Sequence, residues 1–134
     1  MKGHARHLMT DKVVSISPET TLAEIGRILL GEGFGGVPVV EEDLRVIGFV
    51  SQDDLLAALL RDAPEVSVAR DVMNHPPIVV DEFTATDDVL ALLREAGIHH
   101  LPVVRSGRLV GIITPHDVLR YYVEKVLPRP PERA

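Results

Sequence analysis

Val37-Pro38-Val39-Val40, followed by Arg45-Val46-Ile47-Gly48-Phe49-Val50-Ser51, sets the architecture of this chain because both segments occur twice. The first returns as Leu101-Pro102-Val103-Val104, and the second returns as Arg108-Leu109-Val110-Gly111-Ile112-Ile113-Thr114. Self-similarity at a nearly fixed spacing indicates a duplicated structural unit. The turn between the two segments is shorter in the second occurrence, so the sequence predicts two slightly diverged copies of one fold.

The repeat extends on both sides of these segments. Ala5-Arg6-His7-Leu8-Met9 returns as Ala69-Arg70-Asp71-Val72-Met73, with the same spacing as the Pro-Val-Val segment. We place the first copy at residues 5–61, the second at 69–126 and a proline-rich tail at 127–134. A unit of about 55 residues buries little surface alone, because a small domain has a high ratio of surface to volume. We therefore expect the two copies, packed together, to be the folding unit.

Each copy is predicted to run strand, helix, strand, turn, strand, helix, which is an α/β fold of the α+β type. In the first copy, Thr21 is a candidate N-cap and Gly33 a candidate stop for the first helix. Pro38 and Pro102 have no N–H for a ladder and are expected at a strand start or at an edge. The expected strands lie at 13–17 and 78–80, the hairpin turns at 41–44 and 105–107, and the last helices at 53–60 and 116–126.

Composition limits the partners of the protein. The 134 residues carry 14 Lys and Arg against 20 Asp and Glu, a net charge of −6, and 46% of them are hydrophobic. These values are typical of one compact globular domain, and the acidic excess disfavours nucleic acids and anionic membranes as partners. The chain has no cysteine, which excludes disulfides, and no apolar run of the length of a secretion signal or a membrane span. We expect a soluble, cytoplasmic protein.

The motif Gly-x-x-[Ser/Thr]-x-x-Asp closes each copy, around Ser51 and Asp54 in the first and around Thr114 and Asp117 in the second. Each instance ends a predicted strand and opens a helix, where free backbone N–H groups and the helix dipole favour an anion. The hydroxyl is suited to donate to a phosphate and the carboxylate to accept from two ribose hydroxyls, while the glycine leaves room for close approach. The same pattern is also an N-terminal cap, so a purely structural role stays open.

Histidines offer a second kind of candidate. An imidazole at His99 or His100 is suited to donate to a phosphate, although two partly exposed loop histidines are an equally simple interpretation. His4, His7 and His116 do not form a recognisable ligand set, and we predict no metal site. The sequence also lacks a nucleophile turn, a P-loop and a dinucleotide-binding glycine motif after a strand. We therefore expect no catalytic residue, no obligatory cofactor and no enzyme activity.

The duplicated string, the Pro-Val-Val core and the Gly-x-x-[Ser/Thr]-x-x-Asp ending together resemble the cystathionine-β-synthase (CBS) domain. The resemblance covers about residues 5 to 123, and two such domains in tandem resemble a Bateman module. It implies two copies packed through their sheets with pseudo-two-fold symmetry, and two clefts between the copies. In this family such clefts often bind AMP, ADP, ATP or S-adenosylmethionine. The family's role is regulatory sensing, including energy sensing, rather than catalysis.

The resemblance also implies which side chains form each cleft. Because the first cleft has histidine donors and the second is expected to be wider and uncharged, the sequence favours AMP in the first, with ATP as second choice. The first cleft is expected to combine Phe49, Ser51 and Asp54 with Ile78, Ile98, His99 and His100. The second is expected to combine Ile112, Thr114 and Asp117 with Thr10, Val14, Phe34, Gly35 and Gly36.

Two further partners are expected. Many members of the family form homodimers through helices, and the predicted last helices carry apolar side chains for that purpose, although those side chains could instead cover their own sheets. A regulated partner protein is also expected, without an indication of its identity. The alternative function is a structural dimerisation or protein-interaction module that binds no ligand in its clefts. The candidates for the dimer contact are Leu55, Leu56, Leu59, Leu119 and Val123.

Overall fold

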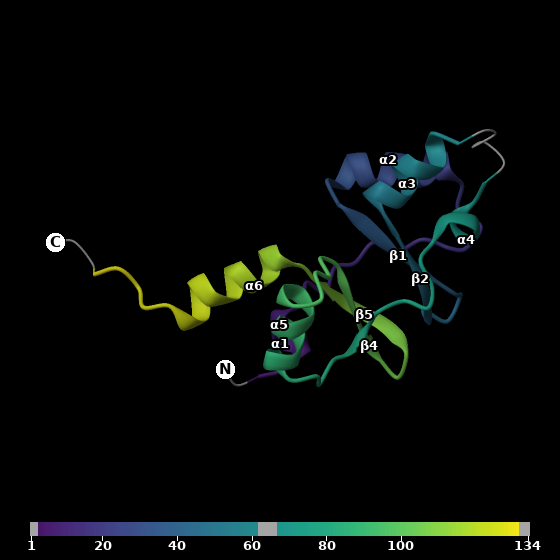
Figure 1. Cartoon of the computed structure of the whole chain (residues 1–134). Coiled ribbons are helices and arrows are strands. Elements are labelled where there is room, and N and C mark those ends of the chain that lie inside the picture. The colour runs from purple at the N-terminus through teal and green to yellow at the C-terminus, as the bar shows by residue number, and fades with distance from the viewer. Residues whose placement is uncertain (1–2, 62–66, 132–134) are drawn as a thin grey trace.

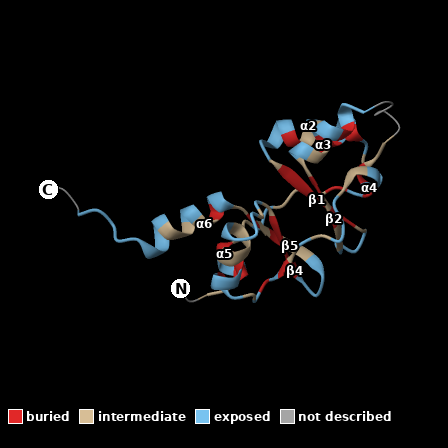
Figure 2. Ribbon diagram, viewed as in Figure 1, coloured by how far each residue is buried: buried red, intermediate tan, exposed pale blue. Residues whose placement is uncertain are grey.

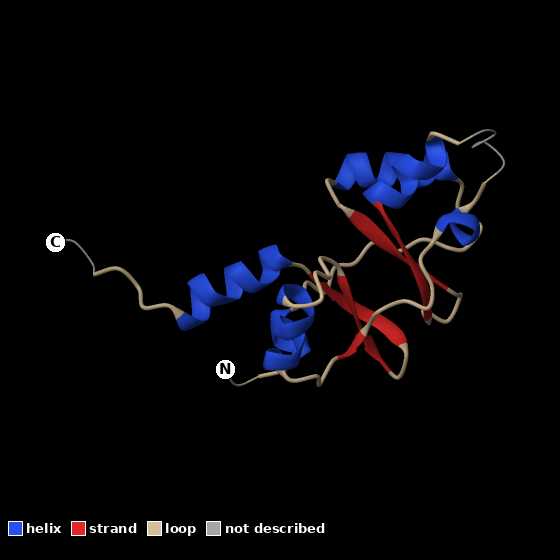
Figure 3. Cartoon of the chain, viewed as in Figure 1, coloured by secondary structure: helices blue, strands red, loops and turns tan. Residues whose placement is uncertain are grey.

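The computed structural model describes residues 3–61 and 67–131, which form two α+β halves, each with a small sheet and helices against it (Figures 1 and 3). The first copy forms α1 (Ala5–Leu8), α2 (Leu22–Glu32), β1 (Gly36–Val40), β2 (Val46–Ser51) and α3 (Gln52–Leu59). The second forms α4 (Ala69–Val72), β3 (Val80–Asp81), α5 (Thr86–Arg94), β4 (Leu101–Arg105), β5 (Arg108–Ile113), α6 (Pro115–Tyr121) and a π-helical turn (Tyr122–Val126). The predicted α+β class is confirmed.

Local signals define the long helices as expected. Helix α2 begins after Thr21, whose hydroxyl accepts a hydrogen bond from the Glu24 N–H at 3.3 Å. It ends at Gly33, which has a left-handed φ of 70° that a residue without a Cβ adopts at little cost. The predicted last helix at 116–126 divides into α6 and the π-helical turn. In Figure 1 this segment extends away from both halves toward the C-terminus.

The two hairpins are near-copies of each other. Strands β1 and β2 pair antiparallel with an irregularity after Val39, and β4 and β5 pair antiparallel with one after Val103. Pro38 lies inside β1 rather than at its start, but it removes no ladder bond. Its partner Phe49 directs its own N–H and C=O away from β1, toward Asn74.

The predicted strands before the first helix of each copy are shorter than expected. At 13–17 only Ile16 forms a bridge, because its N–H donates to the carbonyl of Pro38 and its carbonyl accepts from Val40. At 78–80 the strand is β3, which begins at Val80 and pairs parallel with β4. Val13 and Val14 of the first segment instead line a cavity together with residues of the second copy. The helical turns α1 and α4 were not predicted, since four residues carry little periodicity.

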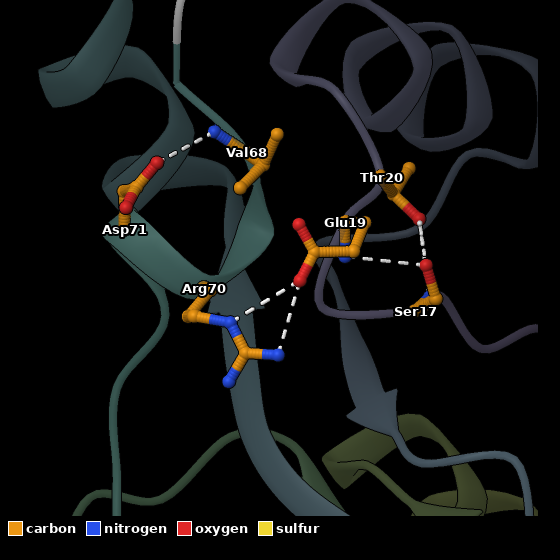
Figure 4. A network of polar contacts seen from close by, with 6 residues as sticks. All are labelled: Ser17, Glu19, Thr20, Val68, Arg70 and Asp71. Atoms are coloured by element: carbon orange, nitrogen blue, oxygen red, sulfur yellow. Dashed lines mark hydrogen bonds and ion pairs between the residues drawn. The ribbon is translucent and has the colours of Figure 1, made fainter.

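Each copy begins with a short helical turn that packs into the other copy. We call it the leading turn; it is α1 with Met9 in the first copy and α4 with Met73 in the second. The N–H of Ala69 donates to the carbonyl of Thr20, and at the equivalent place in the repeat the N–H of Ala5 donates to the carbonyl of Thr84. Figure 4 shows the contact between α4 and the first copy, where Arg70 forms an ion pair of 3.0 Å with Glu19. Contacts exchanged in equivalent pairs are what a pseudo-two-fold axis requires. The predicted pseudo-symmetric packing is therefore confirmed.

The hydrophobic cores reflect this exchange, and Figure 2 shows the buried residues concentrated in the strands and on the inner sides of the helices. The core under α2 and α3 includes the fully buried Ala69, with Met73 packed against it. The core under α5 includes Ala5 and Leu8, with Met9 packed against it. Neither core is complete without the leading turn of the other copy. Among the helices of residues 3–61 and 67–131, none has the length and apolar character needed to cross a bilayer.

The motif glycines make room for these methionines. A Cβ added at Gly111 would overlap the sulfur of Met9 and lie 2.8 Å from its Cγ, and Gly48 stands in the same relation to Met73. The expected close approach is therefore made by a side chain of the leading turn rather than by a ligand.

We predict that Gly111→Ala lowers the free energy of unfolding by about 1–3 kcal/mol, the usual cost of overpacking a core. Urea unfolding measures the change. Met9→Ala in the same chain should recover part of the loss, because it removes the overlapping atoms. Gly31→Ala is the matched control, since a Cβ at this position in α2 meets no atom within 4 Å. A Gly111→Ala variant as stable as that control would contradict this packing.

Candidate functional site

The larger set of predicted side chains meets in one cleft, which we call the Asp117 cleft. It has a volume of about 320 Å³ and lies where the end of β5 and the start of α6 face segments of the first copy. All eight residues expected there line it, namely Thr10, Val14, Phe34, Gly35, Gly36, Ile112, Thr114 and Asp117. The cleft therefore brings together residues from opposite ends of the chain.

The carboxylate of Asp117 is buried in the wall of this cleft, since its residue is only 4% exposed, and it accepts four hydrogen bonds. Its Oδ2 accepts from the N–H of Thr114 at 2.8 Å and from the hydroxyl of Thr114 at 3.0 Å. Its Oδ1 accepts from the hydroxyl of Thr10 at 2.6 Å and from Nη2 of Arg120 at 2.7 Å. Both oxygens are thus occupied by groups of the protein itself.

The structural interpretation of the motif is correct in both copies. Thr114 caps α6 and Ser51 caps α3, and each forms a reciprocal capping box with the aspartate three residues later. Capping does not remove these residues from the clefts, because Ser51 and Thr114 also line them. One side chain of each motif thus begins the helix and faces the cavity.

Basic side chains gather in the Asp117 cleft, and the expectation of an uncharged cleft is wrong. Lys12, His116 and Arg120 line it together with the predicted residues. An alignment of the two copies could have identified these three residues from the sequence. The equivalent positions of the repeat hold Pro76, Asp53 and Ala57, none of which is basic. The basic side chains are therefore specific to one of two symmetric sites.

The second cleft, which we call the Asp54 cleft, has a volume of about 420 Å³. Six of its seven expected residues line it, namely Phe49, Ser51, Ile78, Ile98, His99 and His100. Asp54 is outside the lining that the described residues form. Its Oδ2 instead accepts from the N–H of Ser51 at 2.9 Å and from Nδ2 of Asn74 at 2.6 Å.

His100 lies between the two clefts and lines both, whereas the resemblance implied only the Asp54 cleft. Its ring stacks on Phe49 with centroids 5.3 Å apart, and its Nε2 would be 2.8 Å from a Cβ at Gly35. Burial lowers the pKa of His100, and the neighbouring His99 lowers it further. The uncharged imidazole is thus the favoured form in this structure.

Comparisons with known proteins agree with this architecture. A family model described as the CBS domain matches residues 5–61 and 69–124. The crystal structure of CBSX2 from Arabidopsis thaliana in complex with AMP has a TM-score of 0.82 and 28% identity, covering 90% of this chain and 96% of that one.

Two curated relatives have matching sequences. An uncharacterized protein of Methanopyrus kandleri is 33% identical over 111 residues, 81% of this chain and 57% of that protein. The chloroplastic protein CBSX1 of Arabidopsis thaliana is 33% identical over 134 residues, 78% of this chain and 57% of that protein. The chain therefore spans somewhat more than half the length of these two relatives.

The lowered pKa of His100 predicts a pH-dependent stability. The unfolded chain binds a proton at this residue near a pKa of about 6.5, while the folded chain keeps the ring neutral to lower pH. Stability is then complete above that value and decreases as the pH falls toward the lowered pKa. Urea unfolding between about pH 5 and pH 8 should show a shallower decrease in His100→Gln than in the unaltered chain. His116→Gln, which alters an exposed histidine of the Asp117 cleft, is the control. Equal slopes of stability against pH in all three proteins would refute the prediction.

Proposed function

We propose that this chain, which belongs to the CBS domain family and carries two CBS domains in tandem, is a regulatory module that binds an adenine nucleotide in its Asp117 cleft. The observation that carries the proposal is the meeting of the buried Asp117 carboxylate, a helix N-terminus and three basic side chains in one cavity. The AMP complex of CBSX2, a protein of the same fold at 28% identity, supports adenosyl ligands as the class.

The electrostatics of the two clefts favour the Asp117 cleft over the Asp54 cleft. A phosphate near Lys12 and Arg120 gains attraction from positive charge, His116 offers a further donor, and the N-terminus of α6 adds its dipole. In the repeat, the positions equivalent to Lys12 and Arg120 are Pro76 and Ala57, so the Asp54 cleft lacks these two charges. The sequence-based preference for the Asp54 cleft rested on His99 and His100. His100 also lines the Asp117 cleft.

The same charges widen the range of nucleotides. On sequence alone, a net charge of −6 without an evident Lys or Arg clamp for a triphosphate favours AMP over ATP. Lys12 and Arg120 line one cleft and provide two such side chains. We therefore propose AMP, ADP and ATP as ligands of the Asp117 cleft. S-Adenosylmethionine, which carries a positive sulfonium, is more compatible with the Asp54 cleft.

Regulation requires that occupancy change an interaction with another molecule. Helix α6 links the cleft to the exposed C-terminal segment, so it is the element through which we propose that the signal passes (Figure 1). The proposed homodimer has four of its five expected side chains available, since Leu56, Leu59, Leu119 and Val123 are exposed. Leu55 is buried in the core of its own copy and does not contribute. The regulated protein is not identified by these features.

We predict that AMP binds with a saturable heat of binding that is lost in Asp117→Ala and retained in Asp54→Ala. Each variant removes one capping box, and Asp117→Ala also removes the partner of Arg120 and of the Thr10 hydroxyl, so thermal unfolding must confirm that both variants are folded. Titration calorimetry with AMP, ADP, ATP and S-adenosylmethionine measures the binding. Loss in Asp54→Ala alone would move the site to the other cleft. If no ligand binds to the unaltered chain at millimolar concentration, the structural or protein-interaction function is favoured instead.

A further inference from the structure

We propose that Arg120 makes binding in the Asp117 cleft conditional on a phosphate, so that the cleft accepts nucleotides and rejects nucleosides. The inference rests on the proposed nucleotide function and goes further, because it assigns ligand selectivity to one side chain. In the structure Arg120 pairs with the carboxylate that a ribose would need. A ligand that takes this carboxylate must therefore offer Arg120 another anion.

Arg120 and Thr10 both bond the same oxygen of Asp117. Nη2 of Arg120 lies 2.7 Å from Oδ1 of Asp117 and 3.3 Å from the hydroxyl of Thr10, which donates to the same Oδ1. The Asp117 side chain is 5% exposed and the Arg120 side chain 42% exposed. Of the two partners, Arg120 is the one with a solvent-facing side chain that is able to move.

Both oxygens of Asp117 already accept two hydrogen bonds each. Two vicinal hydroxyls need at least one of these oxygens, and Oδ2 is committed to the cap of α6. Oδ1 is therefore the oxygen that becomes available, by displacement of Arg120. A guanidinium that loses its carboxylate partner is left as an unpaired positive charge on the wall of the cleft. A ligand phosphate relieves this, and a neutral nucleoside does not.

Among the residues that the structure describes, the other copy has no cation paired with the equivalent aspartate. The carboxylate of Asp54 is held by the neutral amide of Asn74 at 2.6 Å, and Ala57 stands where Arg120 would be. Displacement of an amide leaves no unpaired charge. The phosphate requirement therefore belongs to the Asp117 cleft alone, and it separates two sites that arose by duplication of one unit.

The test compares AMP with adenosine by titration calorimetry in the unaltered chain, in Arg120→Gln and in Lys12→Gln. In the described part of the chain Lys12 lines the same cleft without a hydrogen bond to Asp117, so it is the matched loss of one charge. We expect the ratio of AMP affinity to adenosine affinity to fall at least about 10-fold in Arg120→Gln, with tighter binding of adenosine. In Lys12→Gln only AMP binding should weaken.

The outcomes separate this inference from the proposed function. If the unaltered chain binds AMP but Arg120→Gln weakens AMP without strengthening adenosine, Arg120 is an ordinary phosphate contact and the inference is overturned. If the unaltered chain binds no nucleotide, the proposed function itself fails. Arg120→Lys keeps the charge and should keep the preference for AMP. That result would show that the effect of Arg120→Gln comes from the lost charge and not from misfolding. Thermal unfolding of each variant confirms the folded state.

Discussion

The reciprocal insertion of the two leading turns is the constraint on which the rest of this molecule depends. Each hydrophobic core is completed by the turn of the other copy, through Ala5 and Leu8 in one direction and Ala69 in the other. The turns also bring the segments after them to the opposite sheet, where Thr10 pairs with Ile112 and Asn74 with Phe49. The contacts that stabilise the fold are thus the contacts that form the walls of both clefts.

Symmetry of the backbone does not make the clefts chemically equal. Lys12 and Arg120 line the Asp117 cleft, whereas the equivalent positions of the repeat hold the uncharged Pro76 and Ala57. A duplicated fold can therefore hold two sites with different ligand preferences, because surface side chains of a cleft diverge at little expense in core packing. The His100 ring, which lines both cavities, is the physical link between them.

Capping a helix and lining a cleft are not alternative roles for the motif residues Ser51 and Thr114. The aspartate of each motif forms a capping box with Ser51 or Thr114, and for Asp117 this fixes the position of the carboxylate at the cleft. A carboxylate held in place loses little conformational entropy when a ligand binds. In the Asp117 cleft the other oxygen, Oδ1, accepts from Thr10 and Arg120, so a fixed carboxylate is paired with a partly exposed cation.

The sequence alone determined the duplication, the α+β class, the hairpins and the long helices. These rest on local signals, such as the period of apolar residues, turn glycines and caps, or on comparison of one copy with the other. The residues expected in each cleft came from the resemblance to the CBS domain. Only the tertiary structure decided that Arg120 and Thr10 share Asp117, that Asp54 is held by Asn74 outside its cleft lining, and that His100 lines both cavities. Thr10 and Asp117 lie near opposite ends of the chain, and side chains at that separation meet through the exchange of leading turns, which leaves no periodic trace in the sequence.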